Sequence, residues 1–338
     1  MADRDGAIEA FLKAHGWGGA KRLRLAGDAS FRHYERVTQG GRTAVLMDAP
    51  PAKENVRSYV TVARILKRLG YSAPEIYAED VANGLLLIED LGDDTYTRIF
   101  AHADDATEHD LYALAVDLLI DLHRRDEAAI TAGVPGYDDE KLLAEAALLV
   151  DWYLPAMRGE PAADSLRREY LGLWTKLFPV ARAVKSTLVL RDYHVDNLMW
   201  LPRRRGLARV GLLDFQDAVK GPAAYDLVSL LEDARRDIKP SLVREMMDRY
   251  AAAFPAIDRA AFLAAYSVLG AQRHCKVIGI FTRLAVRDRK PVYLGHIPRV
   301  WRLVEADLAH PVLRPVADWL ARHIPPELRG VPKCQSAA

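Results

Sequence analysis

The chain has 338 residues, and 50% of them are apolar or aromatic, which is enough for two lobes that each bury a core. It contains 47 Lys and Arg against 46 Asp and Glu, so its charge gives no reason to expect a nucleic-acid partner. The sequence contains only two cysteines, which predicts that there is no disulfide framework. Its acidic N-terminus has no apolar segment of signal length, and the chain has no run of about 18 apolar residues. These features predict a cytoplasmic protein that binds no membrane.

The first 90 residues favour a β-rich lobe. A short helix is predicted over Asp3–His15, and Lys21–Asp48 has the pattern of strands separated by turns. Apolar residues at helical spacing predict a helix over Glu54–Leu69. The pattern then returns to strands, at Ile76–Ala78 and Gly84–Glu89.

Beyond Asp93 the sequence becomes helical, and Thr107 with Asp110 forms a helix start signal ahead of a run of leucines. Further helices are predicted over Asp139–Trp152, Asp164–Val184, Ser241–Ala253 and Asp258–Ala285. Between them, a short hairpin is predicted from Thr187–Leu190 and Arg209–Leu213. The pattern indicates an α+β fold with a small, β-rich lobe over residues 1–90, a mainly helical lobe over 91–325 and a loose tail over 326–338.

Two stretches in this hairpin region, Leu190–Leu198 and Leu212–Asp217, combine the side chains that phosphoryl transfer needs. The polyphosphate of ATP needs Mg²⁺, and the acceptor hydroxyl needs a carboxylate that orients it and accepts its proton. Asp192 is the candidate base, while Asn197 and Asp214 are candidate Mg²⁺ ligands. Singly, Asp192 and Asn197 could do no more than fix turns, but their joint spacing favours catalysis.

These stretches resemble the aminoglycoside phosphotransferase-like branch of the protein kinase superfamily. That branch has Asp and Asn at this spacing, a metal loop that begins with Asp-Phe, as Asp214-Phe215 does here, and a Gly-Pro…Tyr-Asp-Leu block like Gly221–Leu227. The resemblance implies a two-lobed protein-kinase-like fold, with ATP as co-substrate and Mg²⁺ as cofactor. It implies that residues 1–90 form the nucleotide-binding lobe and that residues 91–325 form the catalytic and substrate lobe. It also implies a hinge at Glu89–Gly92, where the backbone near Glu89 and Leu91 would contact adenine.

A loop of small residues between two predicted strands is the candidate phosphate loop. Its backbone N–H groups could approach phosphates as a nest, although an ordinary hairpin turn has the same composition. The loop residues predicted to bind nucleotide are Gly27, Asp28, Ala29 and Ser30.

In the kinase superfamily, the third strand presents a lysine to the α- and β-phosphates. Here the third predicted strand has Met47 near that position, so the lysine is missing. A cation is still needed beside a polyphosphate, since one Mg²⁺ leaves considerable charge unbalanced. Arg32, just past the loop, is the first candidate, with Lys53 and Arg57 as alternatives. The missing lysine also leaves open a catalytically silent nucleotide-binding regulator.

The short span between Asp214 and Gly221 favours a small-molecule acceptor over a protein. Three segments, Gly27–Arg32, Val45–Pro51 and Arg191–Leu198, together resemble the cell-wall-recycling sugar kinases, and Met47 belongs to the same resemblance. These enzymes phosphorylate the anomeric hydroxyl of N-acetylmuramate and N-acetylglucosamine with ATP, which implies a role in peptidoglycan recycling. The alternative acceptors within the superfamily are an aminoglycoside, choline or homoserine.

Three polar residues near Asp192 are candidates to bind the sugar: His194, Asp196 and Gln216. Each has an alternative role, because His194 could orient the loop, Asp196 could cap a turn or brace Arg191, and Gln216 could bind backbone. The protein is expected to bind ATP and an N-acetylated amino sugar as a monomer.

Cations at helical spacing form a second candidate substrate region, made of Arg273, Lys276, Arg283 and Arg287. This stripe, with Arg273 as the named candidate, could hold the lactyl carboxylate of N-acetylmuramate, or it could be a solvated cationic face. The segment Pro202–Gly206 contains three consecutive arginines and is interpreted as a solvated hairpin turn.

Overall fold

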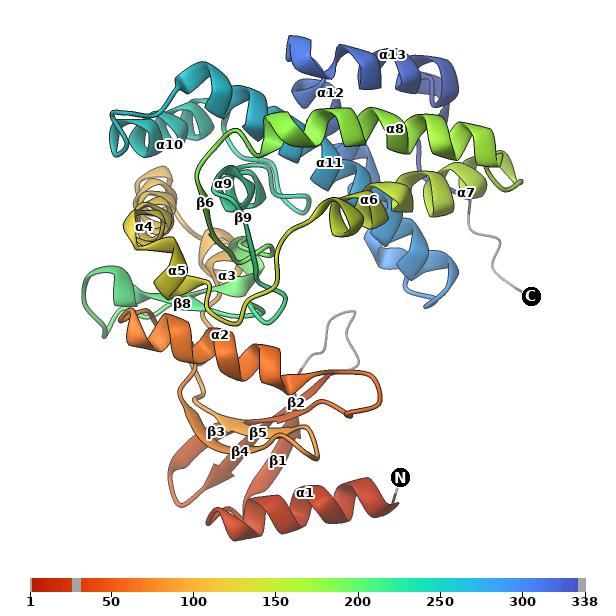
Figure 1. Ribbon diagram of the computed structural model, residues 1–338. Coiled ribbons are helices and arrows are strands. Elements are labelled where there is room, and N and C mark those ends of the chain that lie inside the picture. The colour runs from red at the N-terminus through yellow and green to blue at the C-terminus, as the bar shows by residue number, and fades with distance from the viewer. Residues whose placement is uncertain (1, 26–31, 334–338) are drawn as a thin grey trace. The chain divides into compact units, whose positions relative to one another are not determined.

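The computed structural model describes residues 2–25 and 32–333, which form two compact units (Figure 1). The first unit holds Met1–Leu118, Ala132–Val134 and Val195–Ala218, and the second holds Leu119–Thr131, Pro135–His194 and Val219–Ala338. A sheet dominates the start of the chain and helices dominate the rest, which confirms the predicted α+β class. The lobe boundary at residue 90 stays a prediction. No helix in the described residues is long and apolar enough to cross a membrane.

The first unit contains a five-stranded sheet in the order β1-β2-β3-β5-β4, in which every neighbouring pair is antiparallel. Its strands are β1 (Lys21–Arg24), β2 (His33–Gln39), β3 (Arg42–Asp48), β4 (Ile76–Asp80) and β5 (Leu85–Ile88). The predicted order of three strands, a helix and two strands is therefore confirmed. Residues 26–31 lie outside the described residues, and they include Gly27, Asp28, Ala29 and Ser30, which were predicted to form the phosphate loop.

One face of this sheet is buried under α1 (Ala2–Ala14), because Phe11 and Leu12 pack with Val37, Leu46 and Leu87 in one apolar cluster. Figure 1 shows α2 (Val56–Arg68) on the other side of the sheet from α1. Asn55 caps α2 by accepting the backbone N–H of Arg57 at 3.0 Å. Successive residues of a strand point to opposite faces, so Met47 points away from Leu46 and α1.

A second, two-stranded sheet in the first unit consists of β7 (Leu198–Trp200) and β8 (Val210–Leu212), with η2 (Val195–Asn197) before it and η3 (Gly206–Arg209) between its strands. Beside it, Thr95 forms a bridge with Met199 and Ser72 forms one with Gly211. The helix α3 (Tyr96–Phe100) also belongs to this unit, while α4 (Asp105–Arg124) begins in it and ends in the second.

The predicted hairpin of Thr187–Leu190 with Arg209–Leu213 is wrong in its pairing. In the structure, β6 (Ser186–Val189) pairs with β9 (Val219–Pro222), and β8 pairs with β7. The apolar run at β7 follows Asn197 directly, and the nearby turn at 202–205 returns the chain to it, so β8 finds its partner locally.

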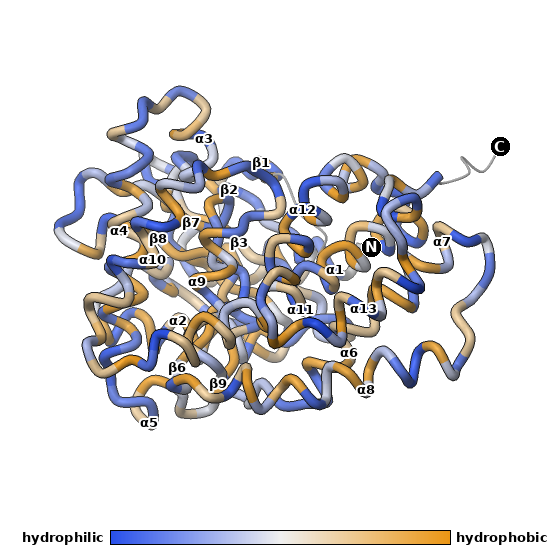
Figure 2. The backbone as a smooth tube through the Cα atoms, turned by 90° about the horizontal axis from the view of Figure 1, so that it is seen from above, coloured by the Kyte–Doolittle hydropathy of each residue, from blue (hydrophilic) through white to orange (hydrophobic). Residues whose placement is uncertain are grey.

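The second unit is mainly helical. Figure 2 shows apolar and polar residues alternating along α8 (Asp164–Ala181), as expected of a helix with one buried face. The long helix α11 packs against α6, α8, α9 and α12. The predictions for helices near 139–152, 164–184, 241–253 and 258–285 are confirmed. The principal helices are α5 (Glu127–Ile130), α6 (Asp139–Leu148), the π-helical turn η1 (Leu149–Tyr153), α7 (Leu154–Arg158), α8 (Asp164–Ala181), α9 (Ala224–Leu231), α10 (Pro240–Ala252), α11 (Arg259–Val286), α12 (Ile297–Asp307) and α13 (Arg314–His323).

Three short 3₁₀ turns complete this unit, at η4 (Pro291–His296), η5 (Pro311–Leu313) and η6 (Pro326–Leu328). The segment from 326 onward was expected to be loose, but its described part is bonded to the helices. The carbonyl of Leu328 accepts from the Tyr153 hydroxyl at 2.7 Å, and Arg329 forms an ion pair with Glu305 at 2.8 Å.

Candidate active site

In the first unit, the two predicted Mg²⁺ ligands lie at the same end of the β7–β8 pair. The carbonyl of Asn197 accepts the N–H of Leu213 at 3.0 Å, which places Asn197 beside the residue that precedes Asp214. Asp214 has a φ of 56°, which is uncommon outside glycine, so the chain turns sharply as soon as β8 ends. Carboxylate and amide oxygens are ligands that Mg²⁺ prefers, and this donor set fits that ion.

Asp214 is surrounded by donors from two other predicted site residues. Its Oδ1 accepts from the guanidinium of Arg32 at 3.2 Å and from the side-chain amide of Gln216 at 2.8 Å. The Arg32 side chain is 10% exposed, so a largely buried cation faces the candidate metal ligand. Met47 is fully buried and pairs in register with Tyr34, so β3 presents no charge at that position.

The acidic side chains of the predicted hinge pair with arginines. Glu89 forms an ion pair with Arg204 at 2.5 Å, and Asp90 forms one with Arg36 at 2.7 Å. Arg204 was expected to be solvated in its turn, but only 29% of its side chain is exposed, because Glu89 holds it. The backbone contact of Glu89 and Leu91 with adenine stays a prediction.

Asp196 also belongs to the first unit, where its carboxylate accepts a hydrogen bond from the hydroxyl of Thr97 in α3. This bond holds η2 against α3. Asp196 therefore has a structural partner, and its contact with a sugar stays a prediction.

In the second unit, the loop that carries Asp192 follows β6 and is fastened by Asp226 of α9. The buried Asp226 carboxylate accepts the N–H of Leu190 at 2.6 Å and that of Arg191 at 2.8 Å. Arg191 has a φ of 70°, an unusual conformation that these bonds maintain. Burial raises the pKa of Asp226 to about 7. The Gly221–Leu227 block thus has a physical role that its sequence alone did not reveal.

Asp192 is a partly buried carboxylate with cations around it. Burial by itself raises the pKa of Asp192, but the nearby cations, led by Lys276, outweigh it and hold this pKa below the usual value. The side chain is therefore ionised at neutral pH. An ionised carboxylate is the form that can accept a proton from a hydroxyl.

A buried network around Glu145 lies beside this loop, and sequence reasoning missed it. Glu145 of α6 forms ion pairs with Arg191 and, at 3.2 Å, with Lys276 of α11, and it accepts the hydroxyl of Tyr137 at 2.5 Å. Lys276 also donates to the hydroxyl of Tyr225 at 3.3 Å. A single Glu in an amphipathic helix gives no signal that distinguishes it from a surface residue.

The cationic stripe predicted on α11 is not a solvated face. Arg273 is 4% exposed and donates to the hydroxyl of Ser229 at 2.8 Å, and Lys276 is 7% exposed. In contrast, Arg287 is exposed and pairs with its neighbour Asp288 at 2.7 Å. Because helices surround α11, residues at helical spacing on it do not share one solvent-facing side.

His194 is buried beside Arg235, which sequence reasoning also missed. Nε2 of His194 lies 3.4 Å from Nη1 of Arg235, and the N–H of Arg235 donates to Asp233 at 2.8 Å. Burial lowers the pKa of His194, so its imidazole is neutral at neutral pH.

Comparison with known proteins identifies the family. Residues 21–263 match the model of the phosphotransferase enzyme family. An N-acetylmuramate/N-acetylglucosamine kinase from Caulobacter vibrioides is 37% identical over 97% of this chain and 99% of its own. A protein of the same name from Pseudomonas aeruginosa is 38% identical over 94% of each chain. This chain belongs to the phosphotransferase enzyme family. The prediction of an ATP-dependent phosphotransferase is thereby confirmed.

Solved structures of the same fold include other kinases. A choline kinase from Streptococcus pneumoniae has a TM-score of 0.62 at 13% identity, over 90% of this chain and 99% of its own. An aminoglycoside 2'-phosphotransferase in complex with GDP has a TM-score of 0.60 at 18% identity, over 90% and 98%. At these identities the likeness concerns the fold, and it confirms the predicted protein-kinase-like architecture of this phosphotransferase.

A second group of ligand types lies elsewhere in this phosphotransferase. Glu232, His274 and Asp307 are close enough together that one ligand atom of each lies within 4.8 Å of the others. However, Nδ1 of His274 contacts Asp307 at 2.8 Å and Nε2 lies 3.4 Å from the carbonyl of Glu232. With both ring nitrogens engaged, the imidazole joins α9, α11 and α12 as a structural link.

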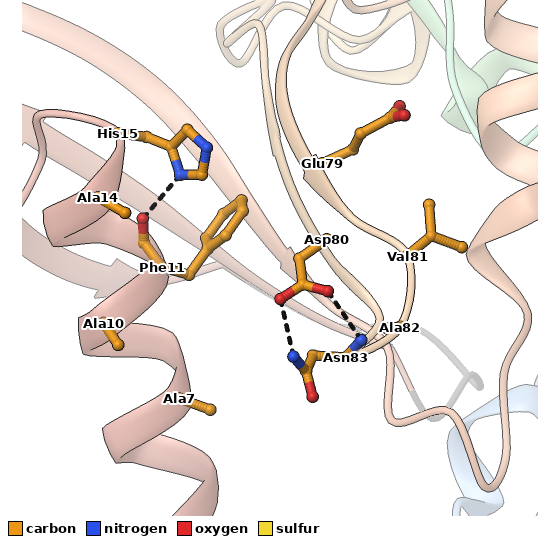
Figure 3. Close-up of a pocket in the computed structure, with 10 residues that line it drawn as sticks. All are labelled: Ala7, Ala10, Phe11, Ala14, His15, Glu79, Asp80, Val81, Ala82 and Asn83. Carbon is orange, nitrogen blue, oxygen red and sulfur yellow. Dashed lines mark hydrogen bonds between the residues drawn. The ribbon is translucent and has the colours of Figure 1, made fainter.

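An open groove of about 690 Å³ lies between α1 and the turn after β4 (Figure 3). Ala7, Ala10 and Phe11 line it on the helix side. Asp80 closes the turn, because its carboxylate accepts the backbone N–H of Asn83 at 3.0 Å and the side-chain amide of Asn83 at 2.8 Å. None of the predicted site residues that the structure describes lines this groove, so the groove is separate from the described part of the site.

Proposed function

We propose that this phosphotransferase transfers the γ-phosphoryl group of ATP to the C1 hydroxyl of N-acetylmuramate and N-acetylglucosamine. The observation that carries the proposal is the ionised, partly buried Asp192, whose loop is held by Asp226. In addition, the curated sugar-kinase relatives align with this chain almost end to end. We further propose that it acts as a cytoplasmic monomer in peptidoglycan recycling.

Asp192 orients the anomeric hydroxyl and accepts its proton. An anomeric hydroxyl is more acidic than an ordinary alcohol, so a carboxylate needs no raised pKa to receive this proton late in transfer. The lowered pKa of Asp192 agrees with this role, because the base is ready at every pH near neutrality. The contacts of Asp226 keep the loop backbone in place while the proton moves.

The nucleotide roles belong to residues of the first unit. Asn197 and Asp214 would hold Mg²⁺, which when bound neutralises charge on the phosphates. Arg32, next to Asp214, supplies the cation that the kinase superfamily takes from a lysine. Backbone groups of the loop over residues 27–30 bind the phosphates, and those of the hinge near Glu89 and Leu91 bind adenine.

The sugar roles belong to short polar side chains near Asp192 in the sequence, namely His194, Asp196 and Gln216. A cationic acceptor such as an aminoglycoside or choline would need acidic residues around it. Arg191, Arg273 and Lys276 are among the groups that act on Asp192 instead, which favours a neutral or anionic acceptor.

The test is a product analysis. The purified protein is incubated with Mg²⁺, ATP and a panel of amino sugars, aminoglycosides, choline and homoserine, and NMR locates the new phosphate. We expect phosphorylation at C1 of the two N-acetylated sugars. Asp192→Asn should lower kcat by about 10²-fold or more, since general base catalysis contributes that much.

Asp248→Asn is the matched control, because Asp248 is exposed and pairs only at the surface with Arg259. This variant should keep wild-type turnover. A phosphate at C6 or activity on an antibiotic alone would overturn the acceptor. Binding of ATP without turnover of any compound in the panel would favour a silent regulator.

A further inference from the structure

Gln216 lies two residues after the candidate metal ligand Asp214, in the turn that follows β8. The carbonyl of Phe215 accepts the N–H of Ala218 at 3.0 Å, which closes this turn. The ring of Phe215 is buried and stacks on that of Tyr59 in α2, with 4.8 Å between the ring centres. These contacts within the first unit fix the backbone on both sides of Gln216.

The two ends of the Gln216 amide have different surroundings. The residue is 7% exposed, and its Nε2 donates to Oδ1 of Asp214 at 2.8 Å. A carboxylate accepts hydrogen bonds, so the nitrogen is the end of the amide that faces Asp214. The Oε1 atom is buried and has no hydrogen-bond partner among the residues that the structure describes. Burying an acceptor without a donor is unfavourable, which points to a ligand as the partner of Oε1.

The position of Oε1 indicates the kind of ligand. The oxygen and nitrogen of an amide are about 2.3 Å apart, because both are bonded to one carbon. Oε1 therefore lies within about 5 Å of Oδ1 of Asp214. Two oxygens that ligate one Mg²⁺ lie at most about 4.2 Å apart, and an oxygen that binds through one of the ion's waters lies somewhat further away. An acceptor at this separation from a candidate ligand suits a hard divalent cation.

The Asp214 carboxylate is held by donors on one side. Besides Gln216, the guanidinium of Arg32 donates to the same Oδ1 at 3.2 Å. Two donors on one oxygen keep the carboxylate in a single orientation, and a metal ligand that is oriented in this way binds its ion more tightly. Gln216 can thus act on the cation through both ends of its amide.

We propose that Gln216 is a third side chain of the Mg²⁺ site, in which Nε2 holds the Asp214 carboxylate in place and Oε1 faces the cation as a neutral oxygen donor. This inference rests on the proposed function, which gives the ion to Asn197 and Asp214. An amide has two N–H donors, so the sugar contact proposed for Gln216 can use the second one.

The experiment measures the Kd for Mn²⁺, which takes the same oxygen ligands as Mg²⁺ and is detected by electron paramagnetic resonance. The wild type, Gln216→Leu and Gln216→Glu are compared with and without ADP. Gln216→Leu should raise the Kd by about 10- to 100-fold, as the loss of a residue that supports a metal ligand does. Gln216→Glu should keep the Kd at or below the wild-type value, because a charged oxygen attracts the cation more strongly.

Thermal unfolding gives a second measurement. Gln216→Glu brings two carboxylates together, so without Mn²⁺ its melting temperature should lie below that of the wild type, and Mn²⁺ should restore it. Gln39→Leu is the matched control. Gln39, at the end of β2, also has an Oε1 without a partner among the described residues, but it is partly exposed and lies opposite Arg42 in the sheet. Its variant should retain the wild-type Kd for Mn²⁺.

Four results would contradict this assignment or its basis in distinct ways. A wild-type Kd in Gln216→Leu would show that Gln216 does not serve the cation. An equal rise of the Kd in Gln216→Leu and Gln216→Glu would mean that Gln216 only holds Asp214, so Oε1 does not face the ion. If Gln216→Leu does not fold, Gln216→Met takes its place, and the same wild-type Kd refutes the inference.

The wild type separates this inference from the proposed function. If it binds no Mn²⁺ even with ADP, the proposed role of the cation is wrong, and that of Gln216 with it. If it binds Mn²⁺ but phosphorylates no sugar, the proposed acceptor is wrong, while the Kd values of the Gln216 variants still decide whether this residue belongs to the cation site.

Discussion

Charge near Asp214, the candidate metal ligand, is arranged differently in this chain from the pattern of the kinase superfamily. Met47 is buried on β3 where that pattern has a lysine, while Arg32, one residue before β2, contacts Asp214 at 3.2 Å. The contact joins residues 182 positions apart, so it depends on the folded first unit. A guanidinium in this place can balance phosphate charge without help from the third strand.

Replacing this cation should weaken nucleotide binding. We expect Arg32→Ala to raise the KM for ATP by about 10- to 100-fold, because one charge-assisted contact with phosphate is lost. Arg32→Lys should recover part of the loss. Steady-state kinetics at a fixed sugar concentration measures the KM for ATP, and titration calorimetry with Mg²⁺ and ATP measures the affinity for ATP.

Arg64→Ala provides the comparison, since Arg64 is 64% exposed and its ion pair with Glu79 lies at the surface. Its KM should equal that of the wild type. Unchanged ATP affinity in Arg32→Ala would mean that Lys53 or Arg57 supplies the cation, or that no cation replaces the lysine.

Some candidate site residues can be recognised from the sequence, and others cannot. Asp192, Asn197 and Asp214 stand in short motifs whose spacing predicts a shared chemistry. Glu145 and Arg235 stand in ordinary helical and turn sequence, and long-range packing alone brings them to the loop. Motifs report local geometry, whereas a contact across about 40 residues depends on the tertiary fold.

Among the secondary-structure elements, α11 permits a close approach that only glycine allows. A Cβ at Gly279 would lie 2.3 Å from the backbone carbon of Leu148 and 2.4 Å from its oxygen, at the point where α6 becomes the π-helical turn η1. No side chain can share that space with backbone atoms, so the two helices would have to separate.

We expect Gly279→Ala to lower the stability of the protein by about 1–3 kcal/mol, the usual cost of overpacking. The change is measured by calorimetric unfolding. Gly172→Ala is the matched control, because Gly172 lies inside α8 and a Cβ added there would meet nothing within 4 Å.

That control should raise stability by about 0.5–1 kcal/mol, since alanine favours a helix over glycine. If both variants shift the melting temperature in the same direction, helix propensity decides and the close contact does not matter.

Local patterns located most of the predicted elements, whereas the pairing of distant strands was predicted wrongly. The spacing of apolar residues located α6, α8, α10 and α11, because a buried helix face repeats every three to four residues. Strand pairing near Asp192 was predicted wrongly, since β6 pairs with β9 across about 30 residues. The helices α12 and α13 were not predicted, although both have clear apolar faces.

Considered as a whole, the molecule is almost neutral, with 47 basic and 46 acidic residues, yet part of this charge is buried in the second unit. Burial raises the pKa of Glu232 to about 8 and that of Asp307 well above its usual value, while it lowers the pKa of His274 to about 4. These three groups link α9, α11 and α12, and Arg273 lies near them.

The raised and lowered pKa values make stability depend on pH in opposite directions. His274 binds its proton more weakly in the folded chain, so its contribution to stability is lost as pH falls from about 6.5 to 4. Glu232 keeps its proton in the folded chain up to about pH 8, while the unfolded chain releases it near 4.5. The Glu232 contribution therefore lowers the stability of the folded state as pH rises from 4.5 to 8. Above about pH 6.5, His274 is neutral in both states and no longer changes the stability with pH.

Glu232→Gln keeps the neutral form at every pH, so it should make stability less dependent on pH between about 6.5 and 8. One proton difference corresponds to about 1.4 kcal/mol per pH unit, and this is the expected decrease in slope. Glu160→Gln, at an exposed loop position, should retain the wild-type slope. Unfolding in urea at three pH values measures both variants. An unchanged slope in Glu232→Gln would show that Glu232 is ionised in the folded protein, and the carboxylate would then have to be balanced by its buried neighbours Arg273 and His274.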